Sequence, residues 1–300
     1  MNGIVLSAGM GTRLRPYTDI TPKPAIPFMS VPLACYPLAL FEKIKIHNLV
    51  INTHYLPEKI EKLYRHLRWP MSERPARLIF SAEPENILGS GGGVRHAMKY
   101  LIGREVFFVA NADEVILPLD YMVMKDALAF HQHHNGIATL LCIRHPEVGE
   151  KFGGVWLNEK LDQNTLVSCF SKKPVAGHRG LHFIGVLLLN DSIRNYFFSD
   201  DSKEENLLYD TLTKAMVEGE EVHAMEIQAQ WFETGNPQDF LKASQECLQA
   251  IEAQPPSAWA EYLRQLICRC SVREYQIEND QPALKEKLID RLAKLFAGKL

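Results

Sequence analysis

The sequence predicts an α/β protein with three layers, in which helices cover both faces of a mixed, mostly parallel sheet and a helical tail follows. Two observations lead to this prediction. In the first half of the chain, short apolar runs of strand length alternate with amphipathic segments of helical period, which is typical of parallel strands joined by helical crossovers. Hydrophobic residues make up 46% of the 300 residues, which is enough to bury a sizeable core.

The first half of the chain supplies the parallel strands and their crossover helices. The expected strands are residues 4–7, 49–53, 77–81 and 106–110. The expected helices are residues 38–47, 58–67 and 95–101. In a Rossmann-like sheet of this kind, ligands bind at the carboxyl ends of the strands. The loops that follow these strands are therefore the candidate site.

From residue 138 the strands follow one another more closely. Strands are expected at residues 138–144, 154–158, 167–172, 181–189 and 222–227, with a helix near residues 206–219. Antiparallel strands added to a parallel sheet explain this spacing. The chain then becomes helical, with helices expected at residues 239–252, 257–270 and 282–296. We therefore divide the chain into a main domain, residues 1–244, and a C-terminal helical extension, residues 245–300, through which a homodimer is conceivable.

Charge and composition argue against several classes of protein. The formal net charge of -3 disfavours binding to a nucleic-acid backbone, which requires a basic face. The apolar stretches are shorter than the ~20 residues that span a bilayer, and the first residues lack the positive segment of a signal peptide. The six cysteines have neither zinc-site spacing nor the density of a disulfide scaffold, so a reduced, cytoplasmic protein is expected.

A glycine-rich segment, residues 6–14, directly follows the first expected strand. Gly9 and Gly11 allow backbone N–H groups to approach a phosphate, and Arg13 adds a guanidinium suited to phosphate oxygens. Lys23 follows between two prolines on extended backbone. A dinucleotide fingerprint would need glycine at Leu14, and the Gly-Lys-Ser/Thr of a P-loop is absent. These residues predict a phosphate-binding loop, although a glycine-rich turn without a ligand remains an alternative.

The order Leu-x-x-Gly-x-Gly-Thr-Arg-Leu, followed by Pro-Lys-Pro, resembles the signature of the sugar-1-phosphate nucleotidylyltransferases. The resemblance covers roughly the first four-fifths of the chain. It implies a reaction between a nucleoside triphosphate and a sugar 1-phosphate, in which Arg13 and Lys23 neutralise charge at the reacting phosphates. The loop would cradle the triphosphate through Leu6, Ala8, Gly9, Gly11 and Thr12.

A second glycine-rich segment, Leu-Gly-Ser-Gly-Gly at residues 88–92, follows the third expected strand. From the residues alone, a helix start made flexible by glycines is the favoured interpretation. The segment is also similar to the loop of hexose and heptose guanylyltransferases that contacts the base and sugar, and close to that of N-acetylmuramate-1-phosphate uridylyltransferases. The resemblance slightly favours GTP over UTP and adds to the nucleotide-binding residues Gly89, Ser90 and Gly91.

Two acidic residues are candidate ligands of Mg²⁺. Asp113 follows the strand at residues 106–110, and an aspartate at a strand's carboxyl end is well placed to hold Mg²⁺ against phosphates. A turn-forming aspartate is the alternative. Glu233, in Trp-Phe-Glu-Thr-Gly-Asn-Pro, stands where the family has its second metal-binding aspartate.

The sugar side departs from the family pattern. Residues 170–174, Phe-Ser-Lys-Lys-Pro, resemble the family's Glu-Lys-Pro, so Lys173 matches the lysine that grips the sugar phosphate. Lys172 replaces the glutamate that commonly binds sugar hydroxyls, which favours an acidic or otherwise modified sugar. Gly154 and Gly185 match glycines of the strands that border the sugar.

The departures at Lys172 and Glu233 keep a second hypothesis open, a non-catalytic homologue that binds a nucleotide sugar and regulates a partner. A regulator would have little need of the other charged residues of the pattern, and these favour an enzyme: Arg13, Lys23, Asp113 and Lys173. The histidines at residues 131–134 have no acidic partner at ligand spacing, so a solvated helix end is expected there.

Overall fold

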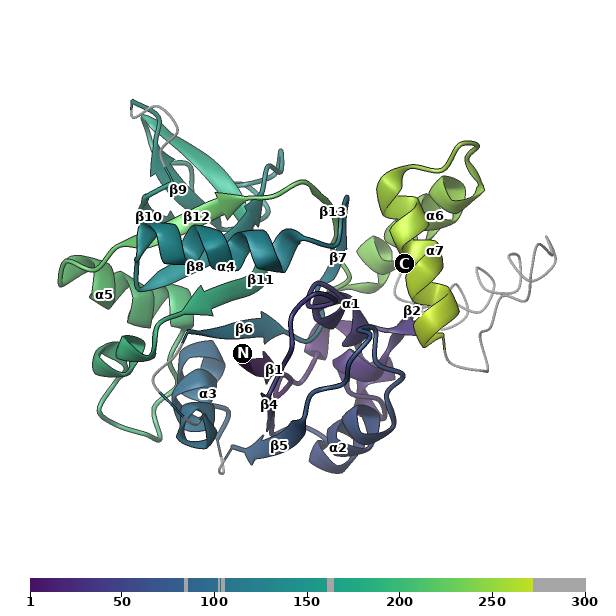
Figure 1. Ribbon diagram of the computed structural model, residues 1–300, viewed down its shortest axis with the longest axis horizontal. Helices are drawn as coiled ribbons and strands as arrows, with labels where there is room; N and C mark the ends of the chain where they lie inside the picture. Colours follow the sequence, from purple (N-terminus) through teal and green to yellow (C-terminus); the bar gives the residue numbers. More distant parts are fainter. Residues whose placement is uncertain (84–85, 102, 104–105, 161–164, 272–300) are drawn as a thin grey trace.

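The computed structural model describes residues 1–271 except residues 84–85, 102, 104–105 and 161–164, and it has the predicted α/β architecture (Figure 1). Within these residues, nine strands form one mixed sheet of order β10-β9-β11-β6-β1-β4-β5, and β8 pairs with both β11 and β12. The parallel strands of the first half are β1 (Asn2–Leu6), β4 (Asn48–Thr53), β5 (Arg77–Ala82) and β6 (Phe107–Asn111). The second half adds β8 (Ala138–Ile143), β9 (Gly154–Asn158), β10 (Val167–Ser171), β11 (His178–Leu189) and β12 (Val222–Glu226).

Helices and two small ribbons complete the fold. The helices are α1 (Cys35–Ala39), α2 (Pro57–His66), α3 (Gly89–Ala97), α4 (Val123–His134), α5 (Thr213–Val217), α6 (Pro237–Glu252) and α7 (Ala258–Cys270). Single turns and short helices are η1 (Thr12–Leu14), η2 (Tyr17–Asp19), η3 (Lys23–Ala25), η4 (Met98–Tyr100), η5 (Asp191–Tyr196) and the π-helix η6 (Leu207–Leu212). The ribbons pair β2 (Pro27–Phe28) with β3 (Val31–Pro32) and β7 (Val115–Pro118) with β13 (Ala229–Phe232).

The layers follow from the alternation of side chains along the strands. Val5 and Ile51 point to one face of the sheet, where α1, α2 and α4 pack, whereas Ile4 and Val50 point to the other, where α3 and α5 pack. All four side chains are fully buried. The sheet is therefore covered on both faces, as the continuous apolar runs of its strands predict.

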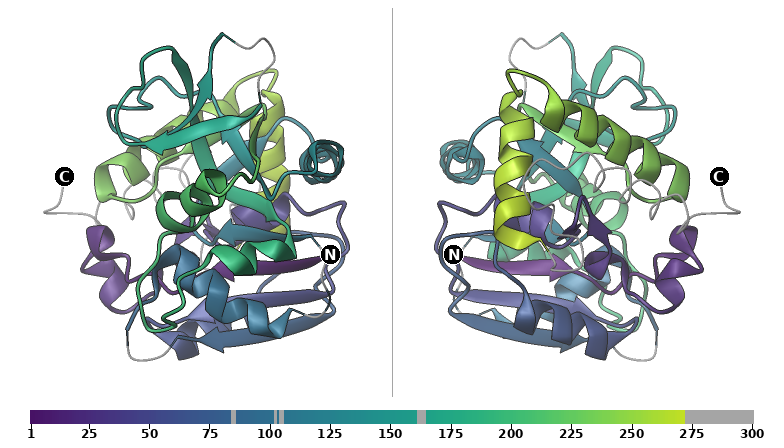
Figure 2. Two further views of the ribbon diagram at one scale, coloured as in Figure 1. Left: turned by 90° about the vertical axis from the view of Figure 1, so that its left-hand side faces the viewer. Right: turned by 90° about the vertical axis from the view of Figure 1, so that its right-hand side faces the viewer.

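The C-terminal helices lie beside the sheet (Figure 2). Their apolar side chains belong to a third cluster of buried residues. Phe240 of α6 and Leu263 of α7 share this cluster with Leu14 and Ile26 of the N-terminal loops. The predicted boundary between residues 244 and 245 falls inside α6, and side chains on both sides of it belong to the same cluster. The predicted helix at residues 282–296 lies outside the described residues.

Two helix predictions for the first half need correction. The helix expected at residues 38–47 corresponds to α1, which ends at Ala39. The chain continues through turns in which the N–H groups of Phe41, Glu42 and Ile44 bond three residues back. These turns bury Leu40 and Phe41 as a helix would. The spacing of apolar residues therefore resembled that of a longer helix. The helix expected at residues 95–101 begins earlier, at Gly89, because the Glu205 carbonyl accepts the N–H of Gly91 in its first turn.

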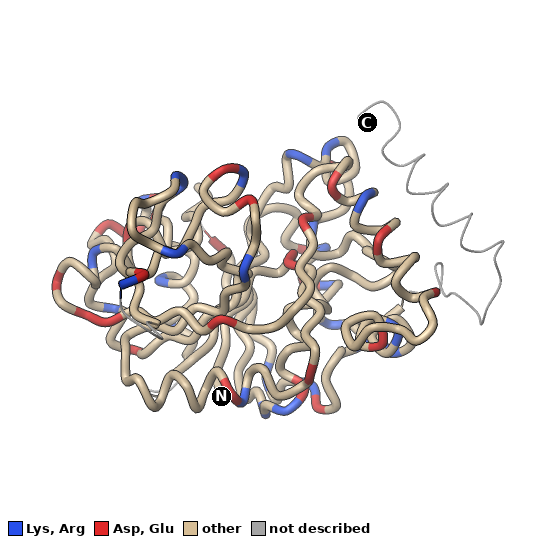
Figure 3. The backbone as a smooth tube through the Cα atoms, turned by 90° about the horizontal axis from the view of Figure 1, so that it is seen from above, with Lys and Arg blue, Asp and Glu red and all other residues tan. Residues whose placement is uncertain are grey.

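Charges of both signs are interspersed along the described backbone (Figure 3). None of the helices in the described part of the chain is long and apolar enough to cross a bilayer.

Candidate functional site

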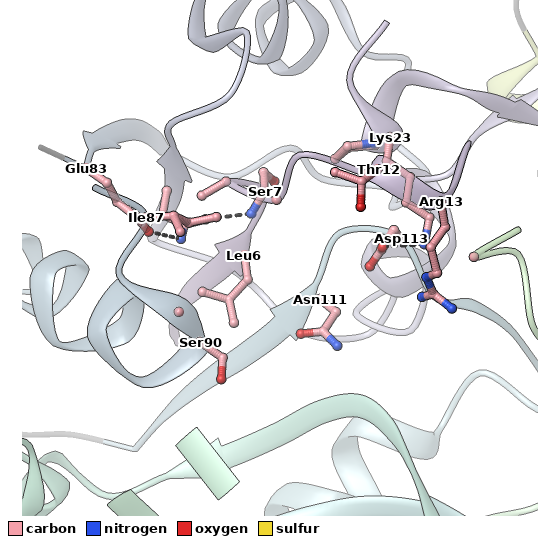
Figure 4. A pocket seen from close by; sticks show the side chains of 17 residues that line it. Leu6, Ser7, Thr12, Arg13, Lys23, Glu83, Ile87, Ser90, Asn111 and Asp113 are labelled. Carbon is pink, nitrogen blue, oxygen red and sulfur yellow. Dashed lines mark hydrogen bonds and ion pairs between the residues drawn. The ribbon is translucent and has the colours of Figure 1, made fainter. Parts of the chain in front are cut away.

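A pocket of about 370 Å³ opens where the parallel strands end (Figure 4). Leu6 and Asn111 are the last residues of β1 and β6, and Asn52 is the penultimate residue of β4. The pocket brings together most of the residues predicted to bind the nucleotide and to neutralise its phosphates: Leu6, Ala8, Gly9, Gly11, Thr12, Arg13, Lys23, Gly89, Ser90 and Asp113. The site thus lies at the edge of the sheet that the sequence indicates.

The glycine-rich loop has the conformation that its glycines allow. Gly11 has a φ of 61°, in the left-handed region, and its carbonyl accepts a hydrogen bond from Thr18 Oγ1 at 2.9 Å. A Cβ atom at Gly11 would lie 2.9 Å from the Thr18 methyl carbon. The loop is therefore folded tightly on η2, and Lys23 starts η3 directly after the extended residue Pro22.

An ion pair between Lys23 and Asp113 occupies one side of the pocket. The Lys23 Nζ atom lies 2.6 Å from Asp113 Oδ2, and the two side chains are 13% and 32% exposed. Burial alone would lower the pKa of Lys23, but the charge and hydrogen bond of Asp113, with the charges of Glu114 and Glu233, raise it above its usual value. Lys23 is therefore a cation held among three carboxylates.

Arg13 and Glu233 approach the same pocket across Gly235. A Cβ atom at Gly235 would lie 2.6 Å from Arg13 Nη2 and would also strike Glu233 Oε1. The Gly235 N–H donates to Glu233 Oε1 at 2.5 Å. Gly235 lines the pocket, so the missing side chain at this position lets one guanidinium and one carboxylate reach the pocket edge.

Of the two predicted ligands of Mg²⁺, Asp113 lines the pocket, whereas Glu233 lies beside Gly235 and outside the lining. Mg²⁺ is usually bound by one or two carboxylates together with phosphate oxygens and water. In the described part of the chain, no group of three or more His, Cys, Asp or Glu side chains could hold a metal ion. A two-carboxylate site completed by a phosphate ligand is thus the arrangement that these residues could form.

A hydrogen-bonded chain links the strand ends, and its residues carry no motif that predicts a role in the site. The Ser7 N–H donates to Asn52 Oδ1 at 2.5 Å, and Asn52 Nδ2 donates to Glu83 Oε1 at 2.7 Å. The other oxygen of Glu83 accepts the N–H of Leu88 at 2.9 Å. Burial raises the pKa of Glu83 although both hydrogen bonds oppose the shift. The chain connects the phosphate loop to the start of α3, and position at a strand end was the one signal that could have identified Asn52.

The predicted sugar-side residues lie outside the lining of this pocket. Lys172 and Lys173 are exposed after β10. Gly185 has a φ of 76°, and a Cβ atom there would lie 2.6 Å from Glu114 Cγ and 2.7 Å from Asn111 Nδ2. Gly185 therefore adjoins the pocket through Asn111. Gly154 differs, because a Cβ atom there would lie 2.7 Å from the Trp156 ring.

Gly91 is also placed away from the pocket lining. Its N–H donates to the Glu205 carbonyl at 2.8 Å, and a Cβ atom would lie 2.9 Å from Glu205 Cγ. Glu205 in turn pairs with Arg95 at 2.5 Å. In this structure Gly91 fixes the start of α3 against the segment before η6.

A cluster of aromatic and histidine rings supports the acidic side of the site. Trp231 Nε1 donates to Glu114 Oε2 at 2.8 Å, and the Trp231 ring packs against Phe152 and His182 with centroids 5.2 and 4.3 Å apart. Burial and the charge of Asp113 raise the pKa of Glu114. The cluster draws on three distant segments, so sequence spacing could not reveal it.

The histidines at the end of α4 are not all solvated. His131 is only 2% exposed, and its ring nitrogens contact Thr139 Oγ1 at 2.8 Å and Asn190 Oδ1 at 3.3 Å. Burial lowers its pKa. The expectation of a solvated helix end was thus wrong for His131, which joins α4 to the sheet.

Comparison with known proteins identifies the family. The profile of the nucleotidyl transferase family matches residues 2–250, so the chain belongs to this family. The mannose-1-phosphate guanyltransferase of Debaryomyces hansenii is 28% identical over 257 residues, which are 85% of this chain and 67% of that protein. The mannose-1-phosphate guanylyltransferase catalytic subunit beta of Dictyostelium discoideum is 26% identical over 87% of this chain and 68% of its own length.

Solved structures share the fold. HddC from Yersinia pseudotuberculosis complexed with GMP-PN superposes with a TM-score of 0.62 at 19% identity, covering 82% of this chain and 98% of that one. A UDP-glucose pyrophosphorylase from Acinetobacter baumanii gives a TM-score of 0.68 at 19% identity, covering 89% and 98%.

Proposed function

We propose that the protein joins a nucleoside triphosphate to a sugar 1-phosphate and releases a nucleoside diphosphate sugar and pyrophosphate. The observation that carries this proposal is the charge arrangement of the pocket. Arg13 and Lys23 bring two cations to the carboxyl ends of the strands, beside the carboxylates of Asp113 and Glu233. Cations beside candidate metal ligands suit a reaction between two anions. The names of the relatives, which are sugar-phosphate guanylyltransferases, support the same reaction.

The chemistry requires charge neutralisation rather than a covalent nucleophile. A phosphate oxygen of the sugar 1-phosphate attacks the α-phosphorus, the new P–O bond forms, and the bond to the β-phosphate oxygen breaks as pyrophosphate leaves. Lys23 and Arg13 hold the triphosphate, and Lys173 is assigned to the sugar phosphate. Mg²⁺, held by Asp113 and Glu233, would neutralise phosphate charge.

The glycine-rich segments are assigned to the nucleotide. The loop at residues 6–14 would receive the phosphates, and Gly89 and Ser90 at the start of α3 would contact the base or the sugar. Gly91 is included through the resemblance alone, since its N–H is bonded to Glu205. GTP is the favoured triphosphate, in keeping with the guanylyltransferase names of the relatives. Gly154 and Gly185 are assigned to the sugar side.

Location and assembly are parts of the proposal that other experiments address. The six cysteines are free thiols in the structure, which suits a reducing compartment such as the cytoplasm. A homodimer through the C-terminal helices is tested by sedimentation of the intact chain at several concentrations.

A pyrophosphate-release assay tests the reaction. Purified protein with Mg²⁺ is given GTP, UTP, ATP and CTP, each with a panel of sugar 1-phosphates, and the sugar nucleotide is identified by mass spectrometry. Release is expected with at least one pair, fastest with GTP, and its loss in Asp113→Asn excludes a contaminating enzyme. If the protein binds nucleotide but releases pyrophosphate with no pair, the proposed reaction is refuted. The second hypothesis, a non-catalytic regulatory homologue, would then be favoured.

A further inference from the structure

The strands β9, β10 and β11 form a wing that extends past the carboxyl end of β6. Residues Val186–Leu189 of β11 pair with β6, whereas His178–Leu181 pair with β9. Gly185 therefore lies level with Asn111, the last residue of β6 and part of the pocket lining. The end of β9 that begins at Gly154 is the end directed toward this edge, because Val155 pairs with Leu181.

Gly153, just before β9, lies between two side chains from other elements. A Cβ atom there would lie 2.5 Å from the Tyr209 hydroxyl and 4.0 Å from Lys172 Cγ. The missing side chain lets the hydroxyl approach the backbone and leaves the Lys172 stem on the same side. Gly153, Lys172 and Tyr209 thus form one group, although they come from three segments of the chain.

Tyr209 is held next to the nucleotide pocket by the π-helix η6. The N–H of Leu207 donates to Ser90 Oγ at 2.9 Å, and Ser90 lines the pocket. Asn206 Oδ1 accepts the N–H of Tyr209 at 3.0 Å and caps the helix. Single turns of π-helix occur often at functional sites. Tyr209 is left partly open, with 37% of the residue exposed.

The charge of this group is not neutralised within the described residues. Lys172 and Lys173 are exposed, and neither ammonium has an ion-pair partner in the part of the chain that the structure describes. Two neighbouring cations do have partners, since Lys151, before β9, pairs with Asp239 at 2.9 Å and Arg179 of β11 pairs with Glu226 at 2.7 Å. Burial raises the pKa of Tyr209, so its hydroxyl keeps its proton and can donate. The group therefore combines a hydroxyl donor with a lysine that has no ion pair in the described residues and whose Cγ atom lies on the same side of Gly153.

We infer that Lys172 and Tyr209 form a subsite for a second anionic group of the sugar substrate, and that the protein acts on a sugar 1-phosphate carrying a carboxylate. The inference rests on the proposed function, in which Lys173 serves the phosphate and Lys172 is left for another anion. A carboxylate accepts hydrogen bonds from both donors and neutralises the Lys172 charge, whereas a neutral hydroxyl compensates no charge.

Matched substrates test the inference. Glucose 1-phosphate and glucuronic acid 1-phosphate differ only at C6, as do mannose 1-phosphate and mannuronic acid 1-phosphate. In the third pair, N-acetylmuramic acid 1-phosphate carries a carboxylate on a side branch that N-acetylglucosamine 1-phosphate lacks. In at least one pair, the acid should exceed its neutral partner in kcat/KM by about 10- to 100-fold, the ratio expected for one charge-assisted hydrogen bond.

Variants then assign the preference to these residues. Lys172→Glu should reverse the ratio, and Tyr209→Phe should lower it by about 3- to 10-fold while leaving the KM for the triphosphate unchanged. Lys125→Glu, an exposed lysine of α4 without an ion pair in the described residues, makes the same charge change away from the wing and should leave the ratio as it is. Equal kcat/KM for acid and neutral partners in every pair, or an unchanged ratio in Lys172→Glu, would overturn the inference.

Measurements of equilibrium binding distinguish a wrong subsite from a wrong reaction. An intact protein that turns over no pair would refute the reaction. The same six sugar phosphates are then compared by ligand-observed NMR in the presence of GTP. Tighter binding of an acid that is lost in Lys172→Glu would still support the subsite, and equal binding within all pairs would refute it.

Discussion

Replacing Lys23 by methionine and Asp113 by asparagine, singly and together, measures the ion pair of the pocket. The Nζ–Oδ2 distance is 2.6 Å, and the side chains are 13% and 32% exposed. Exposed pairs contribute about 0–1 kcal/mol, and removing one partner of a fully buried pair costs about 3–5 kcal/mol. This pair is intermediate in burial and has one charge-assisted hydrogen bond, so we expect a coupling energy of about 1.5–3 kcal/mol.

Urea unfolding of the four proteins, without metal or nucleotide, gives the coupling energy directly. The sign of its pH dependence follows from Lys23, whose pKa lies above the usual 10.5. The stabilisation from its charge is complete below the unfolded pKa and is lost only as pH rises through the higher folded value, so the coupling should be equal at about pH 6 and about pH 9.

Activity provides an independent measurement on the same variants. Lys23→Met should lower kcat by about 100- to 1000-fold, the usual effect of removing one group that stabilises transition-state charge. Lys125→Met is the matched control and should change neither measurement. A coupling energy below about 0.5 kcal/mol would refute the interpretation of the ion pair. Activity of Lys23→Met within about threefold of the unsubstituted protein would refute the catalytic assignment.

Three further substitutions test other parts of the site. Phe240→Ala should lower the free energy of unfolding by about 3–5 kcal/mol in urea, because its ring is fully buried behind the Lys23 loop. Gly235→Ala should lower kcat/KM by about 100-fold through displacement of Arg13, with a stability change under about 1 kcal/mol; unchanged kinetics would contradict this. The pKa of Glu83 is raised, so folding favours its protonated form. The free energy of unfolding of the unsubstituted protein, relative to that of Glu83→Gln, should therefore be greater at about pH 4.5 than at about pH 7.5. The opposite pH dependence would contradict the raised pKa.

Local patterns predicted the sheet well because burial of parallel strands leaves a direct trace in sequence. β1, β4, β5 and β6 coincide with their predicted ranges to within one or two residues, since each is a short apolar run bounded by polar residues. The same rule missed β7, because Val115–Pro118 is only four residues long and pairs with a strand more than 100 residues later. The helical period predicted too long a helix at α1, because the successive turns after Ala39 bury side chains at the same spacing as a helix.

The site divides in the same way between local and distant information. Gly11, Arg13 and Lys23 belong to one short segment, so their order alone indicates a phosphate site. Asn52 and Glu83 enter the pocket only because β4 pairs with β1 and β5 pairs with β4. The hydrogen bond between Asn52 and Glu83 joins two separate strands, so residue spacing could not predict it. The sequence did not predict a role for Tyr209 in the site, because its hydroxyl reaches the strands only where Gly153, far away in the sequence, has no side chain.

The C-terminal helices contribute to the site through the loop that they support. Leu14 and Ile26, on the loops that carry Arg13 and Lys23, are buried in one apolar cluster with residues of α6 and α7. Phe28 connects the two sides, with the Phe240 ring 5.3 Å away at an interplanar angle of 83°. Charge stabilisation is effective only when the charged groups are held in place before the reaction, because reorganisation would otherwise cost part of the gain. The helices that follow the sheet therefore hold the two cations of the pocket in position, and this role would remain whether the chain acts alone or as a dimer.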